Sequence, residues 1–445
     1  MSKDNLSGIK IEGSVLSYKG GMLKAKLWPV KLYSVVSLKD SLGSKEQFLV
    51  SGFEQDVALL APLTNASVIS SSAKVQASFD QLKFNLSEAE KIFDCLGPIA
   101  ADARVDDEIS ILSLDNQFSS KQALSDIFFT GIRSVDYFMP IAKGQRVVVI
   151  GNAGSGKSTF LKYILLRASF DIVVVGLIGE RGREVVEILD FLEESGVKNF
   201  KLIISTSSEP PIRRLLSAYS ATSLASYYRE RGLNVLLIID SLTRVARAIR
   251  EIGLQNGEVP FRQGLTPSVF STLPTLLEVP GKTRAGSITA FYTLLTHESD
   301  DQDILAEEVK SLVDGHIILD RKLARRGVYP AVNILSSLSR VAERFLSAKR
   351  LKLVSQVKSY LSMLEADREL MYLSSTPPPH LLKAAELEKM VDRWATQQLC
   401  ECSSPESLEE FDRELEIFLT EKRNQFSFGQ IVSQDNYNFT KVSTR

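Results

Sequence analysis

A glycine-rich loop of the form GxxxxGK[ST] lies at residues 151–159, and it needs a strand before it and a helix after it to hold its shape. The apolar run 146–150 predicts that strand, and residues 160–167 predict the helix. Glycines let successive backbone N–H groups face phosphate oxygens, and the helix start adds partial positive charge. We therefore expect a nucleotide-phosphate site made of Gly151, Asn152, Ala153, Gly154, Ser155, Gly156, Lys157, Ser158 and Thr159.

Two side chains of this loop have separate expected roles. Lys157 is placed to reach the β- and γ-phosphates, and the Ser158 hydroxyl is placed to ligate Mg²⁺. A carboxylate is needed near the same ion, and Asp240 ends the apolar run 234–239, where a strand tip would bring it to the carboxyl edge of the sheet. The plainer alternative is that Asp240 caps the next helix.

Glu180 is a candidate for the chemical step. It follows residues 173–179, which read as a strand and then a loop, so it also lies at a predicted carboxyl end. A carboxylate at that place orients and polarises an attacking water. The alternative is a solvated glutamate within a run of charged residues.

The pattern along the chain predicts three parts. The first 85 residues alternate like short half-buried strands, which favours a small barrel or sandwich. From about residue 144 to 344, apolar runs at 146–150, 172–175, 202–204, 235–239, 287–295 and 317–319 alternate with helical stretches, as in a doubly wound α/β domain. After residue 344 the chain is helical, with a break at residues 377–379 and a polar tail from residue 425.

Composition excludes several classes of protein. The chain has 53 Lys+Arg against 54 Asp+Glu, so its net charge of −1 gives no overall attraction to nucleic acid or anionic lipid. Three cysteines make no disulfide framework and fit a reducing compartment. The polar start lacks a signal-peptide core, and the longest apolar stretch, 172–178, is too short to span a membrane. These features predict a cytoplasmic protein.

Three other blocks stand out along the chain: GERGRE at 179–184, DSLTR at 240–244 and GVYPAV at 327–332. These blocks resemble the rotary ATP synthase catalytic-subunit superfamily. Further blocks are more similar to its flagellar and type III secretion branch, and they are TGIRSVD at 130–136, GSITAFYT at 286–293, DGHI at 314–317 and SSLSR at 336–340. The resemblance implies an α/β, RecA-like P-loop ATPase core at 86–345, an N-terminal β-barrel domain at 1–85, and a C-terminal helical domain with a polar tail at 346–445.

The resemblance also implies roles for single residues. Glu180 would be the catalytic carboxylate, and Arg181 and Arg244 would lie near the γ-phosphate. Tyr329 would pack against the adenine ring, although a core tyrosine is the alternative. Arg340 would be the arginine finger that reaches a neighbouring subunit's γ-phosphate, whereas the plain reading is a surface helix arginine.

The function that the resemblance implies is Mg²⁺-dependent ATP hydrolysis by a homohexameric ring that energises flagellar or type III protein export. Expected partners are export substrates, chaperones, stator-like and stalk proteins, and a membrane export gate, with the ring peripheral at the inner face of the bacterial cytoplasmic membrane. Rival interpretations are a rotary synthase subunit, an RNA-translocating ring motor and a non-catalytic nucleotide-binding subunit. The near-neutral charge argues against the RNA motor, and Glu180 argues against the non-catalytic subunit.

Overall fold

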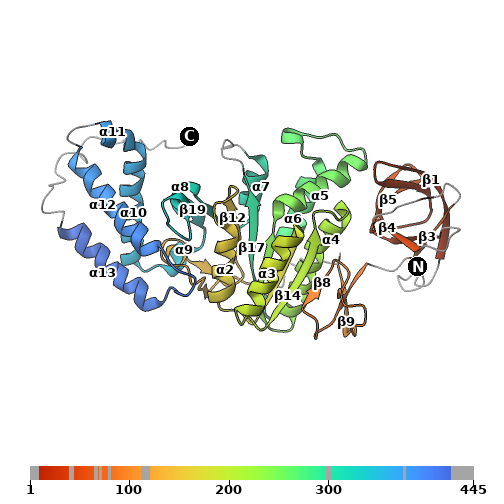
Figure 1. Cartoon of the computed structure of the whole chain (residues 1–445), viewed down its shortest axis with the longest axis horizontal. Helices are drawn as coiled ribbons and strands as arrows, with labels where there is room; N and C mark the ends of the chain where they lie inside the picture. The colour runs from red at the N-terminus through yellow and green to blue at the C-terminus, as the bar shows by residue number, and fades with distance from the viewer. Residues whose placement is uncertain are drawn as a thin grey trace, which may run out of the picture.

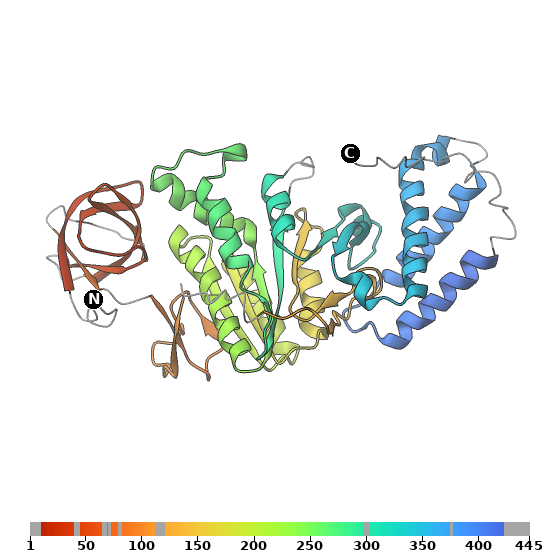
Figure 2. The same ribbon diagram turned by 180° about the vertical axis from the view of Figure 1, so that it is seen from behind.

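The computed structural model describes residues 10–39, 45–64, 69, 73–78, 82–111, 121–296, 303–373 and 377–421. These residues form three parts in a row: a β-barrel at one end, an α/β core in the middle and a group of helices at the other end (Figure 1). The view from behind shows the same order (Figure 2). The predicted polar tail from residue 425 lies outside the described residues.

The N-terminal part is a closed barrel of six strands in the order β1-β2-β5-β4-β3-β6. Alternation explains the closure, because Leu23 and Ala25 are fully buried inside while Lys24 points outward to an ion pair with Glu54. The expectation of a small β domain is confirmed as a barrel. Its strands are β1 (Lys10–Lys19), β2 (Met22–Lys26), β3 (Val35–Lys39), β4 (Lys45–Glu54), β5 (Val57–Pro62) and β6 (Lys74–Ser78).

A short segment connects the barrel to the core. In it β7 (Lys83–Leu86) pairs with β9 (Asp107–Ser110), and β8 (Ile92–Phe93) joins the edge of the main sheet beside β14 (Phe200–Thr206). The predicted boundary at residue 85 therefore falls inside β7.

The core contains one sheet in the order β19-β18-β12-β17-β15-β13-β14-β8, with β16 (Gly281–Lys282) attached to β17. All pairs from β18 to β8 are parallel, and β19 runs antiparallel to β18. Parallel pairing brings the carboxyl ends of β12, β13 and β15 to one edge. The remaining strands are β12 (Arg146–Gly151), β13 (Ile172–Glu180), β15 (Asn234–Asp240), β17 (Ser287–Leu295), β18 (Gly315–Leu319) and β19 (Val332–Ser339).

Helices cover both faces of this sheet, which is why its central strands are largely apolar. Along β12, Val147 and Val149 pack with one cluster and Val148 and Ile150 with the other. One face carries α2 (Lys157–Arg167) and α3 (Gly182–Glu194). The other carries α4 (Pro211–Glu230), α5 (Leu242–Gln255), α6 (Pro267–Leu277) and α7 (Ile304–Leu312). Shorter elements are β10 (Ile127–Phe128), α1 (Arg133–Phe138), β11 (Ile141–Ala142), η3 (Arg262–Gly264) and α8 (Arg321–Arg325).

Most buried residues of the C-terminal helices share the core of the α2 and α3 face, and Leu364, Ala384 and Ala385 form a small cluster of their own. Phe411 stacks on Trp394 with ring centroids 3.8 Å apart, and both rings contact the buried Tyr137 edge-on. Arg350 and Asp412 form an ion pair at 2.6 Å within this cluster. The helices are α9 (Ala342–Phe345), α10 (Ala348–Ala366), α11 (Arg368–Leu373), α12 (Pro379–Ala395) and α13 (Pro405–Glu421).

Candidate active site

The glycine-rich loop joins β12 to α2, as predicted. Gly154 and Gly156 have φ values of 76° and 91°, a left-handed conformation that side chains disfavour. At Gly151 an added Cβ would lie only 2.4 Å from Ser155 Oγ, so this glycine is needed for the loop to turn back on itself. The Ser155 hydroxyl is fully buried and has no hydrogen-bond partner among the residues that the structure describes. The Ser155 hydroxyl can therefore form a hydrogen bond with a ligand bound in the loop.

Lys157 lies at the start of α2 and points back over the loop. Its Nζ donates hydrogen bonds to the carbonyls of Gly151 at 2.5 Å and Asn152 at 2.8 Å. Burial lowers the pKa of Lys157 to about 8, and the nearby carboxylates of Asp240 and Glu180 oppose that shift. The ammonium is thus held close to two acids and to the phosphate-binding backbone.

Glu180 ends β13 and is 8% exposed, so the solvated alternative is excluded. Arg244 from α5 holds it in a two-point ion pair, with both N···O distances at 3.0 Å. Burial raises the pKa of Glu180, and a hydrogen bond with Glu184 and the charge of Asp240 act in the same direction. Arg181 is the exposed residue immediately before α3 and lies beside Glu184. A buried carboxylate with a raised pKa is a stronger base than a solvated one.

Asp240 ends β15, and Leu177 of β13 is its register partner. Its carboxylate accepts a hydrogen bond from Thr293 Oγ1 at 2.5 Å, and α5 begins with no side-chain cap. Burial raises the pKa of Asp240, while the charges of Lys157 and Arg244 lower it. Asp240 is therefore directed toward the charged site and does not cap the helix.

Arg214 on α4 is a residue near this site that the sequence did not indicate. Its Cδ lies 3.3 Å from the position a Cβ on Gly179 would take, beside Glu180. One end of its guanidinium pairs with Glu251 at 2.7 Å, while its buried Nε has no hydrogen-bond partner within the described part of the chain. Only the packing of α4 against the sheet brings this residue here, so no local motif could have revealed it.

Tyr329 lies in the loop between α8 and β19. Its Cε1 is 3.6 Å from the position a Cβ on Gly156 would take, so the ring borders the glycine-rich loop. The side chain is 38% exposed, which excludes the core alternative. Its flat face is thus available beside the phosphate site.

Arg340 lies at the opposite edge of the sheet from the glycine-rich loop. It follows Ser339, which pairs with Gly315, and Gly315 pairs with Val147 at the start of β12. Gly151 is four residues further along β12, roughly 13 Å away at the usual rise of a strand. Arg340 is exposed, as the alternative of a surface arginine expected, but it lies in the turn that follows β19 and not on a helix.

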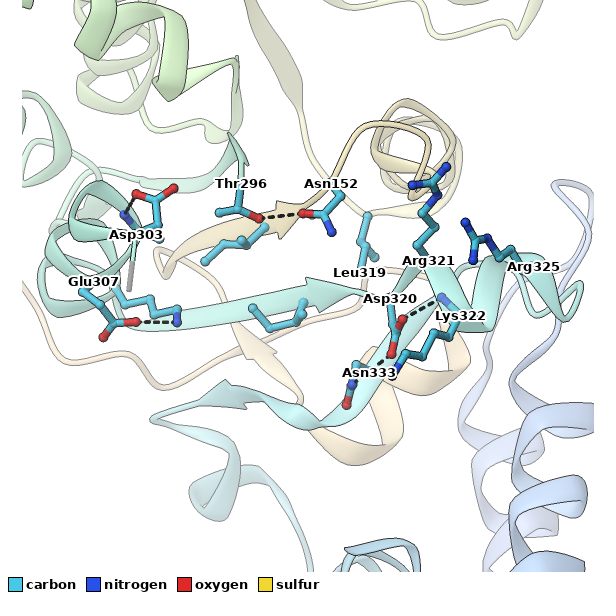
Figure 3. A pocket seen from close by; sticks show the side chains of 15 residues that line it. Asn152, Thr296, Asp303, Glu307, Leu319, Asp320, Arg321, Lys322, Arg325 and Asn333 are labelled. Atoms are coloured by element: carbon cyan, nitrogen blue, oxygen red, sulfur yellow. Dashed lines mark hydrogen bonds and ion pairs between the residues drawn. The ribbon is translucent and has the colours of Figure 1, made fainter. Parts of the chain in front are cut away.

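A cavity of about 490 Å³ adjoins the first residues of the loop (Figure 3). Asn152 accepts a hydrogen bond from Thr296 at its rim, and Arg321 and Arg325 extend from α8 on the far side. One of the acidic side chains that line the cavity, Asp320, accepts a hydrogen bond from the nearby Lys322 backbone N–H. This cavity is separate from the carboxylates at the ends of β13 and β15.

The chain is similar to known proteins in both sequence and structure. A model described as the ATP synthase alpha/beta family, nucleotide-binding domain, matches residues 131–339. The flagellum-specific ATP synthase of Bacillus subtilis (strain 168) is 36% identical over 332 residues, which are 73% of this chain and 76% of that protein. Over the described part of the chain, every helix falls short of the length and apolarity that a bilayer crossing requires.

Solved structures extend the similarity to all three parts. The assembled ATPase EscN from the enteropathogenic E. coli type III secretion system has a TM-score of 0.83 and 32% sequence identity, covering 91% of this chain and 99% of that one. EscN in complex with its central stalk EscO has a TM-score of 0.79 at the same identity and coverage. The chain therefore belongs to the ATP synthase alpha/beta family, in the branch of the flagellar and type III secretion ATPases.

Proposed function

We propose that this chain hydrolyses Mg·ATP as one subunit of a homohexameric ring, and that the ring energises protein export through a flagellar or type III secretion apparatus. The similarity to EscN, which has been solved as an assembled ATPase, supports the ring. The three proposed domains are 1–85, 86–345 and 346–445, with the middle one carrying the chemistry.

The side chains at the carboxyl edge of the sheet have separate roles in hydrolysis. Lys157 binds the β- and γ-phosphates as a point charge, and Glu180 takes the proton from the water that attacks the γ-phosphate in line. Arg244 holds Glu180 in place until the substrate's negative charge competes for the guanidinium. Arg181 at the start of α3 adds positive charge near the γ-phosphate.

The residues at the expected metal position fit Mg²⁺. Ser158 presents an exposed hydroxyl and Asp240 a carboxylate, and hard oxygen ligands of this kind are what Mg²⁺ prefers. When bound, the ion neutralises charge on the phosphate oxygens. Tyr329 then stacks on the adenine ring, which gives base affinity without many hydrogen bonds.

The position of Arg340 is the single observation that carries the ring. Its side chain lies at the sheet edge opposite its own glycine-rich loop, so it cannot reach a γ-phosphate bound there. In a head-to-tail ring the same residue faces the neighbour's nucleotide and neutralises the developing charge. Each site is then completed by the next copy of the chain.

A stalk protein is the first expected partner, because EscN has been solved with its central stalk EscO. Export substrates, chaperones, stator-like proteins and a membrane export gate complete the proposed set. Through them the ring would be cytoplasmic and peripheral at the inner face of the bacterial cytoplasmic membrane.

Turnover against protein concentration tests the proposal. We expect the specific ATPase activity to rise as rings assemble, with the activity eluting at the size of a hexamer on sizing chromatography. Omitting Mg²⁺ should abolish turnover. Full activity in a monomeric fraction would refute the shared site.

A further inference from the structure

The loop that carries Tyr329 is anchored to the C-terminal helices. Arg326 at the end of α8 forms ion pairs with Glu388, at 3.1 Å, and with Asp392, and both acids lie on α12. The carbonyl of Tyr329 accepts a hydrogen bond from the backbone N–H of Gln397 at 2.7 Å. The proposed base-stacking residue therefore takes its position partly from the helical part of the chain.

Gln397 lies in the segment 396–404 between α12 and α13, and it is 3% exposed. Its Oε1 accepts a hydrogen bond from the Arg133 N–H at 2.7 Å, and its Nε2 donates to the Gly131 carbonyl at 3.1 Å. Its own carbonyl accepts from the hydroxyl of Tyr163 on α2. One buried residue thus joins three segments: the loop at 131–133, the helix that follows the glycine-rich loop, and the Tyr329 loop.

These bonds form a continuous connection to the nucleotide side of the molecule. The Tyr329 ring borders Gly156, and Tyr163 lies on the helix that Gly156 begins. Removing the Gln397 side-chain amide costs more than the bonds themselves are worth, because the Arg133 N–H would lose its acceptor. The Gly131 carbonyl would still accept a hydrogen bond from the Ser403 N–H at 3.0 Å. Any change that frees the side chain of Gln397 therefore favours displacement of the segment and of the Tyr329 carbonyl attached to it.

We propose that Gln397 is a positioning residue for the nucleotide base, which fixes the Tyr329 ring over the adenine by holding the segment between α12 and α13 against α2. The inference rests on the base-stacking role proposed for Tyr329. It has a mechanical consequence: a partner that moves the C-terminal helices changes the affinity for the base while the phosphate contacts stay as they are.

The test compares a ligand that has a base with one that lacks it. Dissociation constants of Mg·ADP and Mg·tripolyphosphate are measured by calorimetry on the full-length chain, so no turnover is needed. Gln397→Met and the nearly isosteric Tyr163→Phe should each weaken Mg·ADP about 2- to 10-fold, the worth of one aromatic stacking contact. Tripolyphosphate should bind within about twofold of the unmodified chain, because it makes no stacking contact.

Gln398→Met is the matched control, since this neighbouring glutamine is exposed. It should leave both constants unchanged. The double variant Gln397→Met/Tyr329→Ala should bind Mg·ADP no more weakly than Tyr329→Ala alone, because both changes remove the same contact.

The measurements distinguish failure of the proposed stacking role of Tyr329 from failure of the positioning role of Gln397. If Tyr329→Ala binds Mg·ADP normally, the stacking role fails and the inference fails with it. If Tyr329→Ala weakens Mg·ADP but neither Gln397→Met nor Tyr163→Phe does, only the positioning role is wrong. An equal loss of both ligands would mean that Gln397 acts on the phosphate loop through α2, which also overturns the proposal.

Discussion

Mixing two inactive variants tests whether Arg340 acts on the neighbouring subunit. Arg340→Ala leaves its own glycine-rich loop intact, whereas Lys157→Ala leaves its own Arg340 intact. Each variant alone should be slowed by about 10³-fold or more, because every site in a uniform ring lacks one of the two charges. If, as proposed, these charges come from different copies, mixed rings contain some complete sites.

The recovery follows from simple counting. In an equimolar, randomly mixed ring, a site works only if its own chain carries Lys157 and the adjacent chain carries Arg340. Each condition holds for about half of the positions, so about one quarter of the sites should be complete in a head-to-tail ring. If both residues served the same site within one chain, no mixed ring would contain a complete site.

The assay is steady-state ATP hydrolysis after the two variants are denatured, mixed in varied ratios and reassembled. Activity should peak near the equimolar ratio and vanish at both ends. The control is the same procedure with Lys157→Ala and the double variant Lys157→Ala/Arg340→Ala, which should show no recovery. A flat, inactive profile for the test pair, with assembly verified by sizing chromatography, would refute catalysis across the interface.

Three further predictions concern single sites. Glu180→Gln should bind ATP as well as the unmodified chain does, because the amide keeps the shape of the side chain. It should hydrolyse ATP about 10²- to 10⁴-fold more slowly, because the amide cannot act as a base, and normal single-turnover kinetics would show that Glu180 takes no part in the chemical step. The pKa of Lys157 is lowered to about 8, and its charged form is the one expected to bind phosphate. ATP affinity measured by calorimetry should therefore fall as the pH rises above 8. A constant affinity up to pH 9.5, roughly 1.5 units above that pKa, would contradict this role. Asp412→Ala, which removes the ion-pair partner of the partly buried Arg350 and the acceptor of the Tyr137 hydroxyl, should lower the free energy of unfolding by about 3 kcal/mol in a urea titration. Glu416→Ala, which breaks the more exposed ion pair with Lys349, should lower it by under ~1 kcal/mol, and equal losses would contradict the role given to burial.

The sequence by itself determined the order of elements and the edge at which the chemistry lies. The runs that predicted strands at 146–150, 172–175, 202–204, 235–239, 287–295 and 317–319 are β12, β13, β14, β15, β17 and β18. This succeeded because strand tips in a parallel sheet share one edge, so residues that follow apolar runs are neighbours in space whatever their separation in sequence. Glu180 and Asp240 could be proposed for that reason.

Tertiary structure alone decided which side chains meet across elements that the chain order keeps apart. Arg214 reaches Gly179 only because α4 packs over the sheet, and Gln397 reaches Tyr329 and Tyr163 across more than sixty and two hundred positions of the chain, respectively. Neither residue has a local pattern that marks it, because a buried glutamine or arginine is specified by the surfaces around it. The edge occupied by Arg340 was likewise decided by β19 running antiparallel to β18, since strand direction depends on pairing and cannot be read from an apolar run.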